Sequence, residues 1–388
     1  MVIAQVGNYA IPLLLIPYLV RVLGVAGFGE FAVVQAIINV GIIVVQLGLN
    51  IYITKHIAEI IKNRESINGL VSLAYLLQIS IAIILVAISW GIYKIFPENV
   101  MEMLFLYSFS WLGQAIFPVW YFQGTQRFKQ LAFLNLMLRL SAFVLILIYV
   151  NQINHILRIP VIYSSSYIAT GLIASVYMWR RHKFSWQGFR KIIDLVRNVR
   201  SIFLSNMVSI LLMNMPIFFL NKIVTKEEVG VFSAILRIVY AIKGLLSTSF
   251  QVMIPAFISN KNNINIRDIT QKVLLLVLLI VFASLMLREI VKELLYGSVD
   301  VVNYDIEYIV LMLSVIPGVM GTLYVFVFST YFGAFRIRMH VFIRVFVMAI
   351  LLYYPFIVSF KSIGAAYVIL ISETMLFFLG SKAISHKF

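Results

Sequence analysis

The chain has no cysteine and few charged residues, and each shortage excludes some classes of protein. Without cysteine it can form no disulfide, no thiolate nucleophile and no cysteine-ligated metal site. Only 12% of the 388 residues are charged and 62% are hydrophobic. A soluble domain carries about 25% charged and about 45–50% apolar residues. We therefore expect an integral membrane protein.

Patterns typical of enzymes are also missing from the sequence. The five histidines fall in predicted loops or at the ends of apolar runs, with no metal-ligand spacing among them. No acidic pair marks an outer loop as a sugar-transfer site, and there is no Walker motif for ATP. The sequence therefore predicts neither an enzyme nor a protein that holds a metal or a cofactor.

Long apolar runs occupy most of the chain. A helix that crosses roughly 30 Å of hydrocarbon needs about 20 apolar residues, and it satisfies its backbone hydrogen bonds internally. Such runs predict an all-α integral membrane protein of about 12 transmembrane helices. Their expected limits are 1–22, 30–50, 69–92, 103–122, 132–150, 160–179, 201–221, 230–257, 273–289, 307–332, 341–359 and 363–381.

Basic residues divide unevenly between the two sides of the membrane. Of the 31 Lys and Arg residues, alternate loops place 20 on one side and eight on the other, and three fall inside spans. Basic loops stay in the cytoplasm, so we expect a multi-pass protein with both termini in the cytoplasm. The net charge of +16 then reflects orientation in the membrane, and no nucleic-acid partner is expected.

The two halves of the chain resemble each other when they are shifted by 201 residues. In that register Arg21 falls on Lys222 and Gly29 falls on Gly230. Six helices return the chain to the side on which it started, so two such copies are related by an axis along the membrane normal. The repeat therefore predicts two parallel six-helix bundles.

The repeat also predicts the domain boundaries. We expect an N-terminal six-helix bundle at 1–179, a basic cytoplasmic linker at 180–200 and a C-terminal six-helix bundle at 201–388. The linker carries seven basic residues, which is typical of an amphipathic helix on the inner membrane surface.

Four charged residues lie well inside predicted spans, away from the span ends: Arg139, Arg237, Lys243 and Glu373. A charge at the bilayer centre costs about 2.5–3.5 kcal/mol, so each needs a reason. Arg237 and Lys243 are six residues apart, about 120° around one helix, which fits a wide cavity for a large anion. Snorkelling to the headgroups is the alternative for the two arginines. Glu373 could load a coupling proton or sodium ion, or it could form a salt bridge, and an ion pair is also the alternative for Lys243.

Amide side chains add polar positions to two predicted spans. Gln35 and Asn39 lie in the second span, and Asn206 and Asn214 lie in the seventh. They could line a polar cavity or form hydrogen bonds between helices, and the sequence leaves both interpretations open.

Three stretches carry a family resemblance: PYLVRVLGVAGFGEF (17–31), PVWYFQGTQRFK (118–129) and FFLNKIVTKEEVGVFSAILRI (218–238). They resemble the oligosaccharide flippases of bacterial polysaccharide synthesis. These proteins are the O-antigen repeat-unit translocases of the multidrug/oligosaccharidyl-lipid/polysaccharide exporter superfamily.

The resemblance implies two six-helix bundles around a central cavity, in the bacterial cytoplasmic (inner) membrane. The implied substrate is an undecaprenyl-pyrophosphate-linked oligosaccharide, a repeat unit of O-antigen or another surface polysaccharide. Alternating access would carry it from the inner to the outer leaflet. Arg21 matches the first-span Arg-x-x-Gly pattern of related flippases, although a headgroup contact would also explain it. Arg139 and Arg237 match basic positions common in the fifth and eighth spans, and with Lys243 these residues form the predicted substrate-binding set.

The resemblance also implies partners: the lipid-linked oligosaccharide, membrane lipids, and a polysaccharide polymerase with its chain-length regulator. Two other functions stay open. A cation-coupled multidrug exporter of the same superfamily should have a cavity rich in acids, and a polymerase should carry a large outer loop with catalytic or sugar-binding residues. The cationic spans and the short outer loops favour the flippase.

Overall fold

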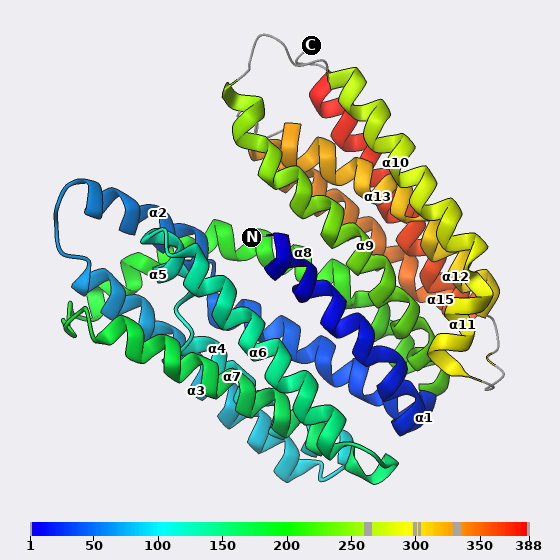
Figure 1. Ribbon diagram of the computed structural model, residues 1–388, viewed down its shortest axis with the longest axis horizontal. Helices are drawn as coiled ribbons and strands as arrows, with labels where there is room; N and C mark the ends of the chain where they lie inside the picture. The colour runs from blue at the N-terminus through cyan, green and yellow to red at the C-terminus, as the bar shows by residue number, and fades with distance from the viewer. Residues whose placement is uncertain (1, 260–265, 298–300, 302–303, 329–334, 386–388) are drawn as a thin grey trace. The chain divides into compact units, whose positions relative to one another are not determined.

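Helices make up almost all of the protein described by the computed structural model, which covers residues 2–259, 266–297, 301, 304–328 and 335–385 (Figure 1). No strand occurs among these residues. Ten helical stretches in this part of the chain are long and apolar enough to cross a membrane. The predicted all-α membrane fold is therefore confirmed, whereas the number of twelve helices stays a prediction.

Two of the ten stretches are long enough to cross a membrane twice. Ala10–Lys62 has 53 residues and Met339–Ala383 has 45, whereas one crossing needs about 20. Gly24 in the first stretch and Lys361 in the second have a non-helical backbone within a long helix. Both residues fall between spans that the hydropathy pattern separates.

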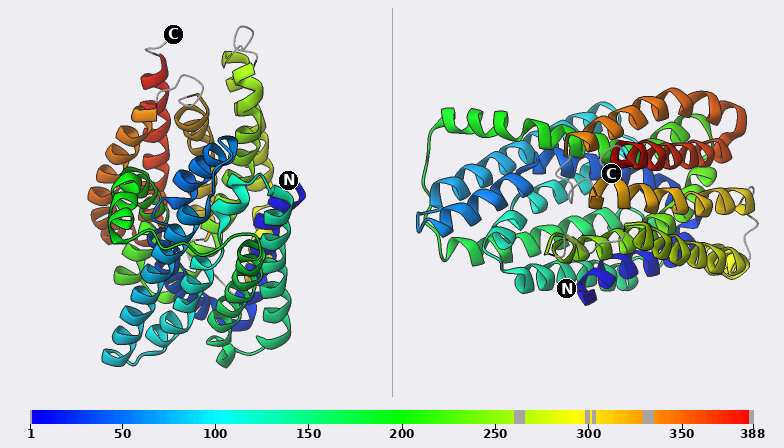
Figure 2. Two further views of the ribbon diagram at one scale, coloured as in Figure 1. Left: turned by 90° about the vertical axis from the view of Figure 1, so that its left-hand side faces the viewer. Right: turned by 90° about the horizontal axis from the view of Figure 1, so that it is seen from above.

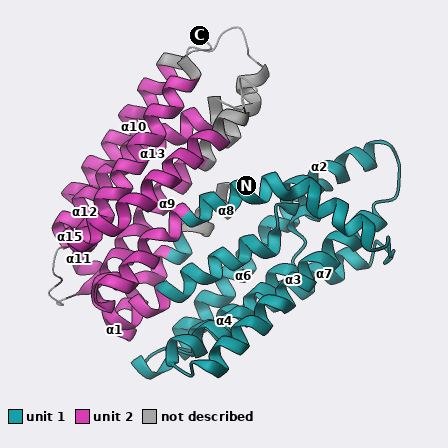
Figure 3. Ribbon diagram, turned by 180° about the vertical axis from the view of Figure 1, so that it is seen from behind, with its two compact units in different colours: residues 1–12, 33–211 teal, residues 13–32, 212–388 magenta. Residues whose placement is uncertain are grey.

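The chain divides into two compact units, shown in different colours in Figure 3. Unit 1 comprises residues 1–12 and 33–211, and unit 2 comprises residues 13–32 and 212–388. The first helix, α1 (Val2–Gln46), therefore contributes to both units.

Unit 1 is a helical bundle. Besides its parts of α1, its elements are α2 (Leu49–Lys62), α3 (Asn68–Ile95), α4 (Asn99–Ala115), α5 (Val119–Gly124), α6 (Phe128–Tyr149), the 3₁₀ turn η1 (Ile153–His155), α7 (Arg158–Trp179) and most of α8 (Phe189–Ile223). The helix α4 packs most closely against α7, and it also packs against α3, while α6 packs against α7 (Figure 2). The second half of the predicted basic linker is helical, because α8 begins at Phe189.

Unit 2 is also helical. Its elements are residues 13–32 of α1, the end of α8, α9 (Lys226–Ser259), α10 (Ile266–Met286), α11 (Arg288–Tyr296), α12 (Tyr304–Leu313), α13 (Val315–Thr322), the π-helical segment η2 (Leu323–Phe328) and α15 (Phe335–Ser385). Both α12 and α13 pack against α15 and α9. These contacts bring α9 and α15, which carry three of the predicted site residues, to the same two neighbouring helices.

The helix α2 lies where the hydropathy pattern predicts a loop. Its apolar residues Leu49, Ile53 and Ile57 recur every four positions and are fully buried, so they form one face of a helix. The opposite face is charged, with Lys55 and Glu59 forming an exposed ion pair of 3.8 Å. The polar face lowers the mean hydropathy of the segment, which is why a search for apolar runs misses it.

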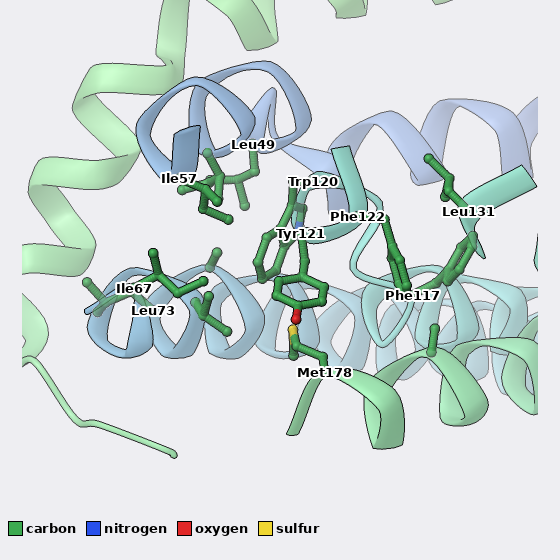
Figure 4. Close-up of a cluster of buried hydrophobic side chains, with 14 of the residues drawn as sticks. Leu49, Ile57, Ile67, Leu73, Phe117, Trp120, Tyr121, Phe122, Leu131 and Met178 are labelled. Atoms are coloured by element: carbon green, nitrogen blue, oxygen red, sulfur yellow. The ribbon is translucent and has the colours of Figure 1, made fainter. Parts of the chain in front are cut away.

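A cluster of buried hydrophobic side chains, four of them aromatic, forms a core of unit 1 (Figure 4). Trp120, Tyr121 and Phe122, which belong to the predicted family stretch 118–129, are at most 1% exposed. Burying a large apolar side chain stabilises a fold by about 1.5–3 kcal/mol. Trp120 Nε1 also donates a hydrogen bond to Gln78 Oε1 at 3.0 Å. This part of the family stretch therefore holds helices together.

Two glycines of unit 2 permit a close approach of two backbones. A Cβ at Gly29 would collide with the carbonyl oxygen of Lys226, and a Cβ at Gly230 would collide with the carbonyl oxygen of Val25. Gly29 and Gly230 are equivalent in the repeat, and Val25 and Lys226 are separated by the same 201 residues. The two contacts are therefore reciprocal, as in a contact across a two-fold axis.

Candidate functional site

Lys243 of α9 and Glu373 of α15 form an ion pair inside unit 2. Lys243 Nζ donates a hydrogen bond to Glu373 Oε1, and the two side chains are only 15% and 21% exposed. Lys243 Nζ also lies 5.9 Å from the ring centroid of Tyr240, whose hydroxyl donates to the Met213 carbonyl oxygen at 2.9 Å. Of the alternatives that the sequence left open for this lysine and this acid, the structure forms the ion pair.

The backbone of α13 faces this ion pair. A Cβ at Gly318 would lie 2.7 Å from Lys243 Nζ and 2.9 Å from Glu373 Oε2, closer than side-chain carbons normally approach. Gly318 therefore leaves room for both charged groups against α13. The same packing excludes any larger residue at this position unless the pair shifts.

Arg237 lies on α9, six residues before Lys243, and its guanidinium stacks on aromatic rings of α1. Its Cζ is 4.7 Å from the ring centroid of Phe28 and 5.7 Å from that of Phe31. Such cation–π contacts are worth about 0.5–2 kcal/mol, more where the cation is desolvated. Both rings are fully buried, so the guanidinium is held against a rigid surface.

Arg21 lies within α1, and its side chain contacts the end of another helix of unit 2, α11. Its Nη2 donates hydrogen bonds to the carbonyl oxygens of Leu294, at 2.9 Å, and Glu293, at 3.3 Å. These carbonyls belong to the last turn of α11, where a helix carries partial negative charge and favours a cation. In this structure the predicted substrate residue Arg21 caps α11.

Arg139 is the predicted site cation of unit 1. It lies 11 residues after Phe128, the first residue of α6, which places it about 17 Å along the helix. It is half-buried and forms no ion pair with any residue that the structure describes. The buried hydroxyl of Tyr167 on α7 is within electrostatic range of its charge. Unit 1 therefore keeps a cation in the middle of an apolar helix.

The four predicted polar positions are divided between the units. Gln35 and Asn39 lie one turn apart on α1, and with Asn206 they belong to unit 1, where all three are half-buried. Asn214 belongs to unit 2 and is only 6% exposed. They do not form one cluster within a single unit.

Sequence reasoning missed a buried acid, Glu307 of α12, which is 1% exposed. Ser362 donates a hydrogen bond to Glu307 Oε1, but Oε2 has no hydrogen-bond partner among the described residues. Glu228 lies within electrostatic range, and its own carboxylate is 3.8 Å from Lys361 Nζ. Glu307 is the first residue of a predicted span, and no local pattern predicts that tertiary packing buries it.

Together these contacts define what the interior of the protein can do chemically. Each unit contains an arginine within an apolar helix, Arg139 in unit 1 and Arg237 in unit 2. A guanidinium can hold a phosphate through two parallel hydrogen bonds. Unit 2 also contains two carboxyl groups, Glu373 and Glu307, that could exchange protons or bind cations.

Comparisons with known proteins show which sequences and folds the chain resembles. A family model described as "Polysaccharide biosynthesis protein" matches residues 1–261, about two thirds of the chain. The chain is 27% identical over 393 residues to a protein of Escherichia coli (strain K12) named "Putative O-antigen transporter". The match covers 96% of the chain and 92% of that relative.

Solved structures of the MATE family of multidrug resistance transporters, in the MOP superfamily, share the fold. An inward-facing conformation matches with a TM-score of 0.76 and 16% identity, over 99% of this chain and 95% of that chain. An outward-facing conformation matches with a TM-score of 0.64 and 15% identity, over 100% of this chain and 94% of that chain. At these identities the likeness establishes the fold alone.

Proposed function

Because the chain belongs to the polysaccharide biosynthesis protein family, we propose that this membrane transporter moves an undecaprenyl-pyrophosphate-linked oligosaccharide from the inner to the outer leaflet of the bacterial cytoplasmic membrane. The relative named as an O-antigen transporter supports an oligosaccharide cargo. The exported unit would then pass to a polysaccharide polymerase and its chain-length regulator.

The observation that carries the proposal is the presence of one arginine within an apolar helix of each unit, Arg139 and Arg237. An intramembrane cation costs about 2.5–3.5 kcal/mol, and an anionic cargo supplies a reason to keep it. The pyrophosphate of the lipid-linked substrate is such a cargo, because its oxygens can accept two hydrogen bonds from each guanidinium. The sugar head would cross in water while the polyprenyl tail stays in lipid.

Alternating access is the transport mechanism that we propose. Proteins with this fold have been solved in both inward-facing and outward-facing conformations, which supports a cycle between two such states. The moving parts would be the predicted bundles at 1–179 and 201–388, joined by the basic linker at 180–200. With the cell interior negative, each negative charge carried outward releases about 2.3 kcal/mol per 100 mV, so the membrane potential favours export.

The ion pair of Lys243 and Glu373 offers a way to couple this cycle to a cation. While the pair is closed, the lysine charge is neutralised by the acid. When Glu373 takes up a proton or a sodium ion, the charge of Lys243 becomes available to an anionic substrate. Glu373 would thus act as the coupling residue and Lys243 as a conditional substrate-binding residue.

The test is export by arginine variants in a strain that lacks its own O-antigen flippase. Arg139→Ala and Arg237→Ala should each abolish surface polysaccharide, and lipid-linked repeat units should accumulate inside. Arg158→Ala is the matched control, because Arg158 is exposed and, among the described residues, hydrogen-bonds only the nearby Tyr149 carbonyl oxygen. Immunoblotting checks that all three proteins reach the same level. Normal surface polysaccharide in both interior variants would falsify the assignment of an anionic cargo.

The multidrug transporters among the neighbours of known fold supply a second candidate function. The buried acid Glu307 and the partly exposed acid Glu373 favour it, because carboxylates suit a cationic drug. Efflux of ethidium from the same strains distinguishes the two functions. A flippase should restore surface polysaccharide without changing ethidium efflux, and an exporter should do the reverse.

A further inference from the structure

A cavity in unit 1 lies between the first turns of α6 and the last turns of α7. Its volume is about 370 Å³, which is within the range of pockets that hold small molecules. Phe133, Leu134 and Ile173 form an apolar wall, and Lys129 and Tyr177 line the other end. Phe133 is 60% exposed and Ile173 is 61% exposed, so the apolar wall opens outward from helices that are apolar enough to span a membrane.

Three cations lie at the polar end of the cavity, and two of them contact Tyr177. Lys129 lines the cavity itself. Arg127 donates a hydrogen bond to the Tyr177 hydroxyl, and its Cζ lies 5.3 Å from the ring centroid. Arg181 lies over the same ring at 4.0 Å and donates to the Tyr177 carbonyl oxygen at 3.0 Å. None of the three forms an ion pair with an acid in the part of the chain that the structure describes.

A neighbouring histidine, His182, lies within electrostatic range of two of these cations. His182 contacts the Tyr121 hydroxyl through Nε2 at 3.2 Å and the Asn68 side-chain oxygen through Nδ1 at 3.1 Å. Burial, followed by the charges of Arg127 and Arg181, lowers the pKa of His182 below its ordinary value. An anion bound beside these arginines would offset their charge.

The two ends of the cavity match the two parts of a membrane lipid. The cations lie at the ends of α6 and α7 that face the predicted cytoplasmic side, the level of the headgroups. The apolar wall begins one turn further into the same helices, the level of the acyl chains. Basic pockets between helices on the cytoplasmic side are a known way to bind anionic lipid headgroups.

We propose that this cavity binds an anionic phospholipid of the cytoplasmic leaflet. The phosphate lies against Lys129, with Arg127 and Arg181 around it, and an acyl chain lies along Phe133 and Ile173. Charge complementarity selects the headgroup, because Lys129 lines the cavity and two further cations, Arg127 and Arg181, contact the lining residue Tyr177. The opening between exposed apolar side chains selects a ligand with a hydrocarbon chain over free phosphate. This site is independent of the proposed transport function.

The experiment uses the full-length protein, purified in detergent and stripped of bound lipid. It is titrated with dioctanoyl-phosphatidylglycerol, dioctanoyl-phosphatidylcholine, inorganic phosphate and farnesyl diphosphate, and one-to-one complexes are measured by native mass spectrometry. We expect phosphatidylglycerol to bind more tightly than phosphatidylcholine, and phosphate alone not to bind. Lys129→Gln should weaken phosphatidylglycerol binding about fivefold, the effect of about 1 kcal/mol per basic residue near an anionic lipid.

Two further variants distinguish binding in this cavity from general electrostatic attraction of anionic lipids to a basic surface. Ile173→Trp fills the apolar end and should weaken phosphatidylglycerol binding without changing the charge. Lys62→Gln removes an exposed lysine of α2, outside the cavity, and should leave binding unchanged. Because Lys129, Ile173 and Lys62 are all exposed, the three variants should keep the melting temperature of the wild type, which is checked in the same samples.

Four results would overturn the proposal. Equal binding of the two phospholipids would show that the headgroup charge does not determine binding. Wild-type affinity in Lys129→Gln would show that the phospholipid does not bind at this cavity. Equal loss in Lys62→Gln and Lys129→Gln reduces the effect to surface charge. Tighter binding of farnesyl diphosphate than of phosphatidylglycerol, lost in Lys129→Gln and Ile173→Trp, would assign the cavity to an isoprenoid diphosphate instead of a phospholipid.

Discussion

The two units place their polar groups differently. In unit 2, Lys243 pairs with Glu373, Arg21 donates to helix-end carbonyls and Glu307 accepts from Ser362. The core of unit 1 is instead built on aromatic packing around 118–129.

This difference indicates that the two units depend on different interactions for their stability. A buried apolar core stabilises one arrangement through packing, and the described residues of this core form no ion pair whose energy depends on protonation. A buried ion pair changes its energy when either partner gains or loses a proton. We therefore expect unit 1 to depend on packing and unit 2 to depend on charge pairing.

The largest effect should come from removing the centre of the aromatic core. Trp120→Ala deletes a side chain with no exposed surface, and it should lower the free energy of unfolding by about 3–5 kcal/mol. Trp90→Ala, also in unit 1, removes a tryptophan that is 52% exposed and serves as the control. Thermal unfolding of both purified variants measures the difference. Equal losses would contradict the view that packing of this cluster holds unit 1 together.

The next effect concerns the ion pair of unit 2. Lys243→Met leaves Glu373 without its partner and should cost about 1–3 kcal/mol, less than for a fully buried pair because both side chains retain some exposure. Lys243→Met combined with Glu373→Leu removes both charges and should recover most of that loss. Measuring the free energy of unfolding of the two single variants and the double variant completes a double-mutant cycle. Additive losses would mean that the two charges do not stabilise each other.

A smaller effect is expected from the glycine that faces the ion pair. Gly318→Ala places a methyl group against Lys243 Nζ and Glu373 Oε2, and it should cost about 1–2 kcal/mol because the ends of these side chains must move. In the background of Lys243→Ala and Glu373→Ala the obstructing atoms are gone, so the same substitution should cost almost nothing. Unfolding of Gly318→Ala in the two backgrounds measures this dependence, and an equal cost in both would place the obstruction elsewhere.

These particular residues show what the sequence could and could not predict. The apolar runs predict most spanning helices, because the length and hydropathy of a span are properties of contiguous residues. The intramembrane positions of Arg139, Arg237 and Lys243 follow from the same runs. The pairing of Lys243 with Glu373 was one of two alternatives, because 130 residues separate them in the chain and only tertiary packing brings them together.

Other features lie beyond a pattern of apolar runs. The helix α2 is amphipathic, so the low mean hydropathy of its sequence predicts a loop. The burial of Glu307 depends on Ser362 and its neighbours, and the contact of Arg21 depends on the end of α11. For Glu307 and Arg21, the contacting residues lie far away in the sequence. For α2, the helical period of the apolar residues predicts the structure better than their mean hydropathy does.

The smallest effect tests whether unit 1 contains a pH-dependent group outside its aromatic core. Burial and the charges of Arg127 and Arg181 lower the pKa of His182, so between that lowered pKa and 6.5 the unfolded chain binds more protons than the folded one. Stability should therefore be fully present above pH 6.5, decline as the pH falls from 6.5 to the lowered pKa of the folded state, and level off below it, with a slope of at most about 1.4 kcal/mol per pH unit. His182→Gln, which cannot titrate but can still contact Asn68 and Tyr121, should remove this decline. Melting temperatures between pH 5 and 7.5 measure it, with His340→Gln as an exposed control, and an unchanged decline in His182→Gln would assign the pH dependence to another group.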